Sequence, residues 1–107
     1  MKKIVLLCDK FNDMFITNDL LATKMKETLV KEAIECEIFV TSIYDIHKQP
    51  LDADVILLTP LICFKQFLIE KMVNCPVDKI GMGAYANMDV EYVLDIAFSK
   101  MTENYIS

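Results

Sequence analysis

The fold is decided by a short apolar run between Asp54 and Pro60, which reads Val55-Ile56-Leu57-Leu58-Thr59. An unbroken run of this length is typical of a strand in a parallel sheet, because helices cover such a strand on both faces. Pro60 ends the run, since proline lacks the amide hydrogen that a central strand needs. Residues 4–7, Ile-Val-Leu-Leu, show the same pattern and predict a second buried strand near the N-terminus.

Further strands and helices alternate on both sides of these two runs. β-Branched and aromatic residues predict a strand over 37–43, and a weaker strand is predicted over 77–82. Apolar residues near a 3.6-residue spacing predict helices over 19–35, 61–73 and 88–101. Strands that alternate with helices form crossover units, in which neighbouring strands run parallel. We therefore predict an α/β fold, an open sandwich with a four-stranded parallel sheet and helices on both faces.

The helical periodicity also predicts which side chains face the core. In the first helix the inward positions are Leu20, Leu21, Met25, Leu29, Val30, Ala33 and Ile34. The segment 61–73 predicts a wide buried face, with apolar residues at positions 61, 62, 64, 67, 68, 69 and 72. In the last helix the inward positions are Val90, Val93, Leu94, Ala97 and Phe98.

The composition points to one globular domain over residues 1–107, because 54% of the 107 residues are hydrophobic. Sixteen acidic residues against eleven lysines, with no arginine, give a net charge of −5. We expect no nucleic-acid binding from such a chain, and it has no guanidinium group to clamp a phosphate. No apolar run approaches the ~20 residues of a membrane span, and the segment before Cys8 is shorter than a secretory signal. We therefore expect a cytoplasmic protein with four free thiols and no insertion into the membrane.

Cys8 follows the first predicted strand and is the strongest candidate for chemistry. Ligands of an open parallel sheet bind beyond the carboxyl ends of its strands, which is where Cys8 lies. A helix follows after a loop, and a helix N-terminus lowers the pKa of a nearby thiol and attracts anions. Cys8 is therefore a candidate nucleophile or part of a phosphate site, and the alternative is a small buried residue that closes the strand.

Other cysteine, metal and nucleotide chemistries do not fit the spacing of the residues. The chain has no C-x-x-C pair for a dithiol, and Met14 stands where a phosphatase loop needs arginine. No metal site is expected, because the cysteines are far apart in sequence and Asp9 and Asp13 match no metal-binding loop. Gly81 and Gly83 match a loose dinucleotide pattern, but a glycine turn before a helix explains them. We therefore expect no cofactor.

Three blocks of the sequence resemble one family. The first block is 3–8, Lys-Ile-Val-Leu-Leu-Cys, followed by Leu20-Leu21 and Met25-Lys26. The second block is 52–60, Asp-Ala-Asp-Val-Ile-Leu-Leu-Thr-Pro, and the third contains Tyr85, Met88-Asp89 and Val93-Leu94. In order and spacing, the blocks resemble the IIB subunit of the bacterial phosphoenolpyruvate-dependent sugar phosphotransferase system, of the lactose/cellobiose type.

The resemblance implies a fold and an activity. The fold is a four-stranded parallel sheet, and the residue that matches Cys8 is a phosphorylated cysteine. That cysteine takes phosphate from a histidine of the IIA subunit and passes it to a disaccharide that the membrane IIC subunit imports. The implied partners are therefore the IIA subunit, the IIC subunit and the sugar, and the protein would meet the membrane through IIC.

The segment between Cys8 and the first helix is the site that the resemblance implies. Thr17 and Asn18 fall where the family has the end of its phosphate-binding loop, so both are expected to bind phosphate. The expected phosphate site also includes the neighbouring charged residues Asp9, Lys10 and Asp19. The expected contact surface for a partner subunit consists of the apolar residues Phe11, Met14 and Phe15.

This loop differs from the family pattern in length and in charge. It is four residues longer, Phe15 replaces a glycine, and three carboxylates join it, those of Asp9, Asp13 and Asp19. A carboxylate ~8 Å from the thiolate costs roughly 0.5–2 kcal/mol, whereas the helix N-terminus contributes about 0.3–2 kcal/mol in the other direction. Two hypotheses stay open: an active IIB subunit with Cys8 as the phosphorylated nucleophile, and a IIB-like binding or regulatory module without phosphotransfer.

Overall fold

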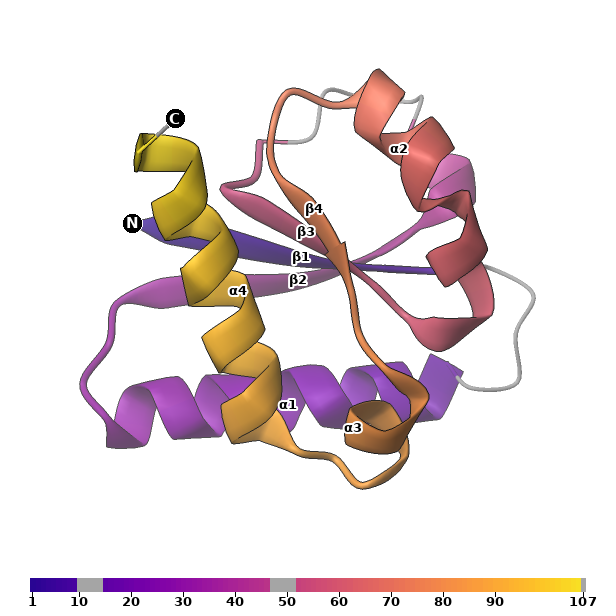
Figure 1. Ribbon diagram of the computed structural model, residues 1–107. Coiled ribbons are helices and arrows are strands. Elements are labelled where there is room, and N and C mark those ends of the chain that lie inside the picture. The colour runs from indigo at the N-terminus through magenta and orange to yellow at the C-terminus, as the bar shows by residue number, and fades with distance from the viewer. Residues whose placement is uncertain (10–14, 47–51, 107) are drawn as a thin grey trace.

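The computed structural model describes residues 1–9, 15–46 and 52–106, which form a sheet flanked by helices (Figure 1). The strands are β1 (Lys2–Cys8), β2 (Cys36–Ser42), β3 (Val55–Leu58) and β4 (Val77–Lys79). The α-helices are α1 (Phe15–Lys31), α2 (Gln66–Met72), α3 (Met82–Ala86) and α4 (Val90–Ile106). Two 3₁₀ helices lie after β2 and before α2, namely η1 (Ile43–Asp45) and η2 (Pro60–Lys65).

The four strands are all parallel and lie in the order β2-β1-β3-β4. The last residue of β1, Cys8, pairs with Ser42 at the end of β2. On its other side, β1 pairs Leu7 with Leu58, the last residue of β3. The carboxyl ends of the strands therefore meet at one edge, and the predicted α/β sheet is confirmed.

Cys8 lies at the topological switch point of this sheet. From β1 the chain passes through α1 to β2 on one side, and from β3 it passes through α2 to β4 on the other. The connections diverge between β1 and β3, and such a divergence leaves a crevice beyond the carboxyl ends of the two strands. The fold thus places the end of β1 where open parallel sheets bind their ligands.

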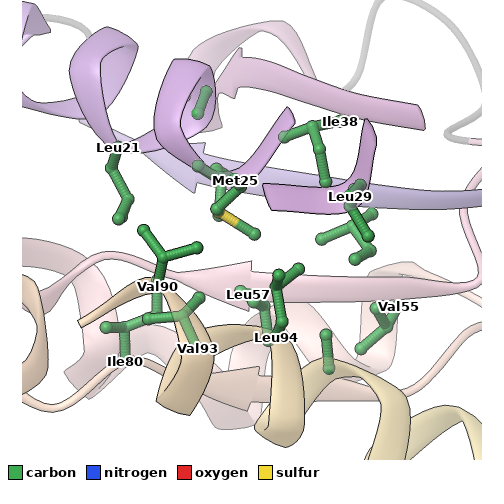
Figure 2. Packing of buried hydrophobic residues seen from close by; sticks show 14 of the residues in the cluster. Leu21, Met25, Leu29, Ile38, Val55, Leu57, Ile80, Val90, Val93 and Leu94 are labelled. Carbon is green, nitrogen blue, oxygen red and sulfur yellow. The ribbon is translucent and has the colours of Figure 1, made fainter. Parts of the chain in front are cut away.

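Two apolar cores lie on opposite faces of the sheet. In Figure 2 Leu21 and Met25 of α1 lie across from Val93 and Leu94 of α4, with Leu57 of β3 in the same cluster. The second core joins alternate strand residues to the segment of η2 and α2, and it includes Val5, Leu7, Ile56, Leu58, Ile62 and Ile69. Successive strand residues point to opposite faces. The unbroken apolar runs are therefore buried on both sides, with α1 below the sheet and α2 above it in Figure 1.

The first helix begins earlier than the periodicity predicts and buries a narrower face. It runs over Phe15–Lys31 rather than 19–35, so Asn18 lies in its first turn. Leu21, Met25 and Leu29 are buried as predicted. The predicted inward residues that are exposed are Leu20, Val30, Ala33 and Ile34, with Val30 80% exposed. One stripe of the helix contacts the sheet, so Leu20 and Val30 beside that stripe point to water, whereas Ala33 and Ile34 lie beyond Lys31, where α1 ends.

The segment predicted as one helix over 61–73 consists of η2 followed by α2. Its buried apolar positions are Ile62 and Ile69, both in the second core. The exposed ones are Leu61, Phe64, Phe67, Leu68 and Met72, with Phe64 76% exposed. The prediction of a wide buried face was therefore wrong, because the segment lies on the sheet along one line and no second layer among the described residues covers its outer side.

The C-terminal part differs from the prediction around its two glycines. β4 ends at Lys79 rather than at residue 82, and Gly81 precedes the short helix α3. Met88 has a positive φ of 53° between α3 and α4, so α4 begins at Val90 rather than at residue 88. The predicted inward residues of α4 that are buried are Val90, Val93, Leu94 and Ala97, and Phe98 is half-buried.

Within the described segments, no helix combines the length and apolarity that crossing a membrane requires.

Candidate functional site

Cys8 is a buried thiol at the carboxyl edge of the sheet. It is the last residue of β1 and is 1% exposed. Its Sγ donates to the backbone oxygen of Thr41 on β2, at 3.6 Å. On the other side of β1, Thr59 follows β3 and is also buried. Its Oγ1 and its backbone nitrogen both donate hydrogen bonds to the backbone oxygen of Leu7. These bonds hold the ends of β1 and β3 together next to the sulfur.

Asn18 brings a buried amide group to the same place. It lies in the first turn of α1 and is 0% exposed. Its Oδ1 accepts a hydrogen bond from the Tyr85 hydroxyl, whereas its Nδ2 has no hydrogen-bond partner within the described part of the chain. Leaving a buried amide donor unpaired costs about 1–3 kcal/mol. An unpaired donor of this kind is suited to an acceptor that arrives with a ligand.

Tyr85 joins a distant segment to the site. It lies on α3, is 1% exposed, and is 67 residues from Asn18 in the sequence. Burial raises the pKa of the Tyr85 phenol, and the nearby sulfur of Cys8 raises it further. The phenol therefore stays protonated at neutral pH and is available as a hydrogen-bond donor.

The electrostatics of the site favour the neutral thiol over the thiolate. Burial is the largest cause that raises the pKa of Cys8, and the negative charges of Asp19 and Asp9 raise it further. The Asn18 side chain acts in the opposite direction, because its amide nitrogen, which is unpaired beside the neutral thiol, donates to the sulfur once the thiol ionises, and this lowers the pKa. The sequence left open whether the helix N-terminus or the carboxylates determine the pKa of this thiol, and the structure adds burial, which is the largest cause and raises the pKa.

The remaining residues of the predicted site are distributed around this cluster. Thr17 is half-buried in α1 beside Asn18, Asp9 is half-buried after β1, and Asp19 is exposed. Lys10, Phe11 and Met14 lie outside the described residues, as does the side chain of Phe15, the first residue of α1. Of the described residues predicted to bind phosphate, Asn18 is thus the one whose polar group is buried beside Cys8.

The site also contains Thr59 and Tyr85, which the sequence places at the carboxyl edge of the sheet, after the third and fourth strands, but to which it assigned no role. Thr59 is a polar residue directly after a buried strand, and that position was the available signal. Tyr85 belongs to the third family-like block and follows the fourth predicted strand, but the sequence did not indicate its contact with Asn18. All four cysteines are free thiols, and Cys36, Cys63 and Cys75 are half-buried. Within residues 1–9, 15–46 and 52–106, no three His, Cys, Asp or Glu side chains are grouped to hold a metal ion.

The fold and the site define an open parallel α/β sandwich with a cysteine at its topological switch point. Residues 3–96 match the family model described as the lactose/cellobiose-specific IIB subunit of the PTS system, the sugar phosphotransferase system. The chain belongs to this family of IIB subunits.

The structure resembles a solved structure with the same fold. The solution structure of a cellobiose-specific phosphotransferase IIB component from Borrelia burgdorferi superposes with a TM-score of 0.72 at 20% sequence identity. The match covers 95% of this chain and 93% of the other chain. No match was found among curated protein sequences.

Proposed function

We propose that this IIB subunit carries phosphate on Cys8, taking it from a histidine of a IIA subunit and passing it to a disaccharide that a membrane IIC subunit imports. One observation supports the proposal most strongly: the unpaired amide of Asn18 is buried beside a cysteine at the switch point of the sheet. The amide supplies hydrogen-bond donors that a thiolate or a phosphoryl oxygen accepts. The Asn18 amide therefore favours an anion at this place without the arginine that this chain lacks, against the burial and the carboxylates that favour the neutral thiol.

The transfer takes place in two displacements at phosphorus. In the first, the Cys8 thiol releases its proton to solvent and its sulfur attacks the phosphoryl group of the IIA phosphohistidine. The S–P bond forms, the P–N bond breaks, and the electron pair of that bond leaves with the imidazole, which takes a proton from solvent. In the second, a sugar hydroxyl attacks phosphorus and loses its proton, the S–P bond breaks, and the sulfur departs as a thiolate that is protonated again.

The raised pKa of Cys8 influences both steps. At neutral pH the sulfur is a thiol that donates a hydrogen bond to the backbone oxygen of Thr41. The thiol must therefore lose its proton before the sulfur attacks phosphorus. A thiolate of high pKa is a strong nucleophile but a poor leaving group. Hydrogen bonds from the Asn18 amide assist departure, because they stabilise the negative charge that returns to the sulfur.

A binding or regulatory module without phosphotransfer is the second candidate function. It is favoured by the burial of Cys8 and by the two carboxylates, of Asp9 and Asp19, that oppose ionisation of its thiol. Such a module would keep the contacts with the IIA or IIC subunit and leave the thiol unmodified.

Labelling with radioactive phosphate separates the two functions. The chain is incubated with a IIA subunit of the lactose/cellobiose type that carries labelled phosphate on its histidine. We expect label on the wild-type chain and on Cys75→Ser, and none on Cys8→Ser. Cys75 is the matched control, because its thiol is half-buried and burial raises its pKa as well. Label on Cys8→Ser would contradict the assignment of the nucleophile, and an unlabelled wild-type chain that still binds IIA would favour the module.

A further inference from the structure

The hydrogen bond between Tyr85 and Asn18 determines which end of the Asn18 amide faces the thiol. An asparagine amide has an oxygen that accepts and a nitrogen that donates, and a rotation of 180° exchanges the two. The Tyr85 hydroxyl donates to Oδ1, which leaves Nδ2 as the end that is unpaired. With the opposite orientation, an amide oxygen would face the sulfur, and that oxygen would repel a thiolate or a phosphoryl group.

Tyr85 is itself held in place by the fold. Its backbone nitrogen donates to the oxygen of Gly81 at 3.0 Å, and its backbone oxygen accepts from the nitrogen of Met88 at 3.2 Å. Its ring belongs to the first apolar core, together with Leu21 of α1 and Val93 of α4. A rigid ring of this kind presents its hydroxyl at a defined position, and that position defines the orientation of the amide.

We infer that Tyr85 is a positioning residue for Cys8: by donating to Asn18 Oδ1, it keeps the amide N–H groups of Asn18 directed at the sulfur and at a phosphoryl group bound to it. This inference rests on the proposed function only in taking Cys8 as the reacting sulfur. Tyr85 acts through Asn18, and its role is distinct from that of Thr59, whose hydroxyl binds the backbone of β1.

The groups that face Cys8 make this role measurable. The described groups that couple to the ionisation of Cys8 are the carboxylates of Asp9 and Asp19, the Asn18 amide and the Tyr85 phenol, and the thiol donates to the backbone of β2. Tyr85→Phe leaves both carboxylates and the ring of the side chain unchanged. A change in the reactivity of Cys8 in this variant therefore reports the orientation of the Asn18 amide if the change depends on Asn18.

A double-mutant cycle tests whether Tyr85 acts through Asn18. The rate of alkylation of Cys8 by iodoacetamide is measured from pH 6 to 10 by peptide mapping in the wild type, Tyr85→Phe, Asn18→Ala and the double variant. We expect Tyr85→Phe to slow alkylation at pH 7 about five- to tenfold and to move the pH profile of the rate to higher pH. The reason is that the Asn18 amide oxygen loses its donor, so the amide N–H groups are no longer held toward the sulfur to stabilise the thiolate. In the Asn18→Ala background, the same substitution should change the rate by less than about twofold, since two sites couple only through a shared interaction.

Two results would overturn the inference. Tyr85→Phe could leave the rate unchanged in the presence of Asn18, or it could slow alkylation equally with and without Asn18. Tyr92→Phe is the matched control, because it removes a phenol hydroxyl from an exposed position on α4 and should not alter the profile. The test requires no phosphate donor, so its outcome is independent of whether the chain accepts phosphate from IIA.

A measurement on the wild-type chain keeps the inference testable if a variant does not fold. The side-chain ¹⁵N–¹H resonances of Asn18 are followed by NMR through the titration of Cys8, with the exposed Asn74 as an internal reference. We expect the Asn18 resonances to shift as the thiol ionises, because its N–H groups then donate to a thiolate. Asn18 resonances that shift no more than those of Asn74 would overturn the inference.

Discussion

Asn18→Asp replaces the amide nitrogen beside Cys8 with a carboxylate oxygen of nearly the same size. The side chain of Asn18 is 0% exposed, and full burial raises the pKa of a carboxyl group by up to about 3–5 units, or ~4–7 kcal/mol. A hydrogen bond from the Tyr85 hydroxyl to the charged group recovers about 1.5–3 kcal/mol. We therefore expect the variant to be about 2–4 kcal/mol less stable than the wild type at pH 7.

The pH dependence of this loss follows from the direction of the change in pKa. The pKa of the new carboxyl group is higher in the folded state than in the unfolded chain, so folding is least impaired below the ordinary aspartate value of about 4. Stability relative to the wild type then falls as the pH rises toward the folded-state pKa. Denaturant unfolding of both proteins between pH 4 and 8 measures this difference.

Phosphate acceptance should fall as well. Above the folded-state pKa, where the new carboxyl group is ionised, a negative charge about 4 Å from the phosphoryl group costs roughly 4 kcal/mol at an effective dielectric constant of 20, which predicts a loss of more than a hundredfold there. The control is Asn74→Asp, which makes the same change of atoms at an exposed position and should alter neither quantity. Parallel stability curves for Asn18→Asp and the wild type from pH 4 to 8 would refute the argument that this side chain lies in a desolvated site.

Three further outcomes are expected. Burial raises the pKa of Cys8, Asp19 and Asp9 raise it further, and Asn18 opposes them, so the pH midpoint of Cys8 alkylation should lie above that of an ordinary thiol, about 8.5. The contribution of the buried thiol to stability should then decline as the pH rises past this unfolded-state value. An alkylation midpoint below about 8.5 would contradict both expectations. Leu57→Ala, at a position with no exposed surface, should lower the free energy of unfolding by about 2–5 kcal/mol in denaturant, whereas Phe64→Ala, at an exposed position, should change it by less than about 0.5 kcal/mol. Equal losses would contradict the difference in burial between these two residues. Substitution of Phe11 and Met14 by serine should weaken binding to a IIA subunit in calorimetry without lowering the melting temperature, and unchanged affinity would contradict their assignment to the partner surface.

Local pattern was sufficient to identify the strands and most of the helices. The runs 4–7 and 55–58 predict buried strands because each residue in them is apolar, whichever face it occupies. The pattern failed over 61–73, where Phe64 and Phe67 are exposed although their spacing resembles that of a buried face. Periodicity indicates which residues share a side of a helix, but it does not indicate whether a second layer covers that side.

The candidate site was predicted in part for the same reason. Cys8 was identified from its place at the end of a strand, and Asn18 from its place in a family-like segment. The direction of the Cys8 pKa was not settled by the sequence, because it depends on how completely the thiol is desolvated against the contributions of Asn18 and of the carboxylates of Asp9 and Asp19.

The sequence by itself determined that this chain alternates strands and helices, that the strands are parallel, and that a cysteine ends the first of them. These features follow from the spacing of hydrophobic residues along the chain and from which residues are adjacent in the sequence. Only the tertiary structure decided the strand order β2-β1-β3-β4, which places the end of β1 at a switch point. It also decided the contact between Asn18 and Tyr85, 67 residues apart, which directs the amide toward the sulfur. Such contacts arise because two cores on opposite faces of one sheet pack distant segments together, and no local pattern records that packing.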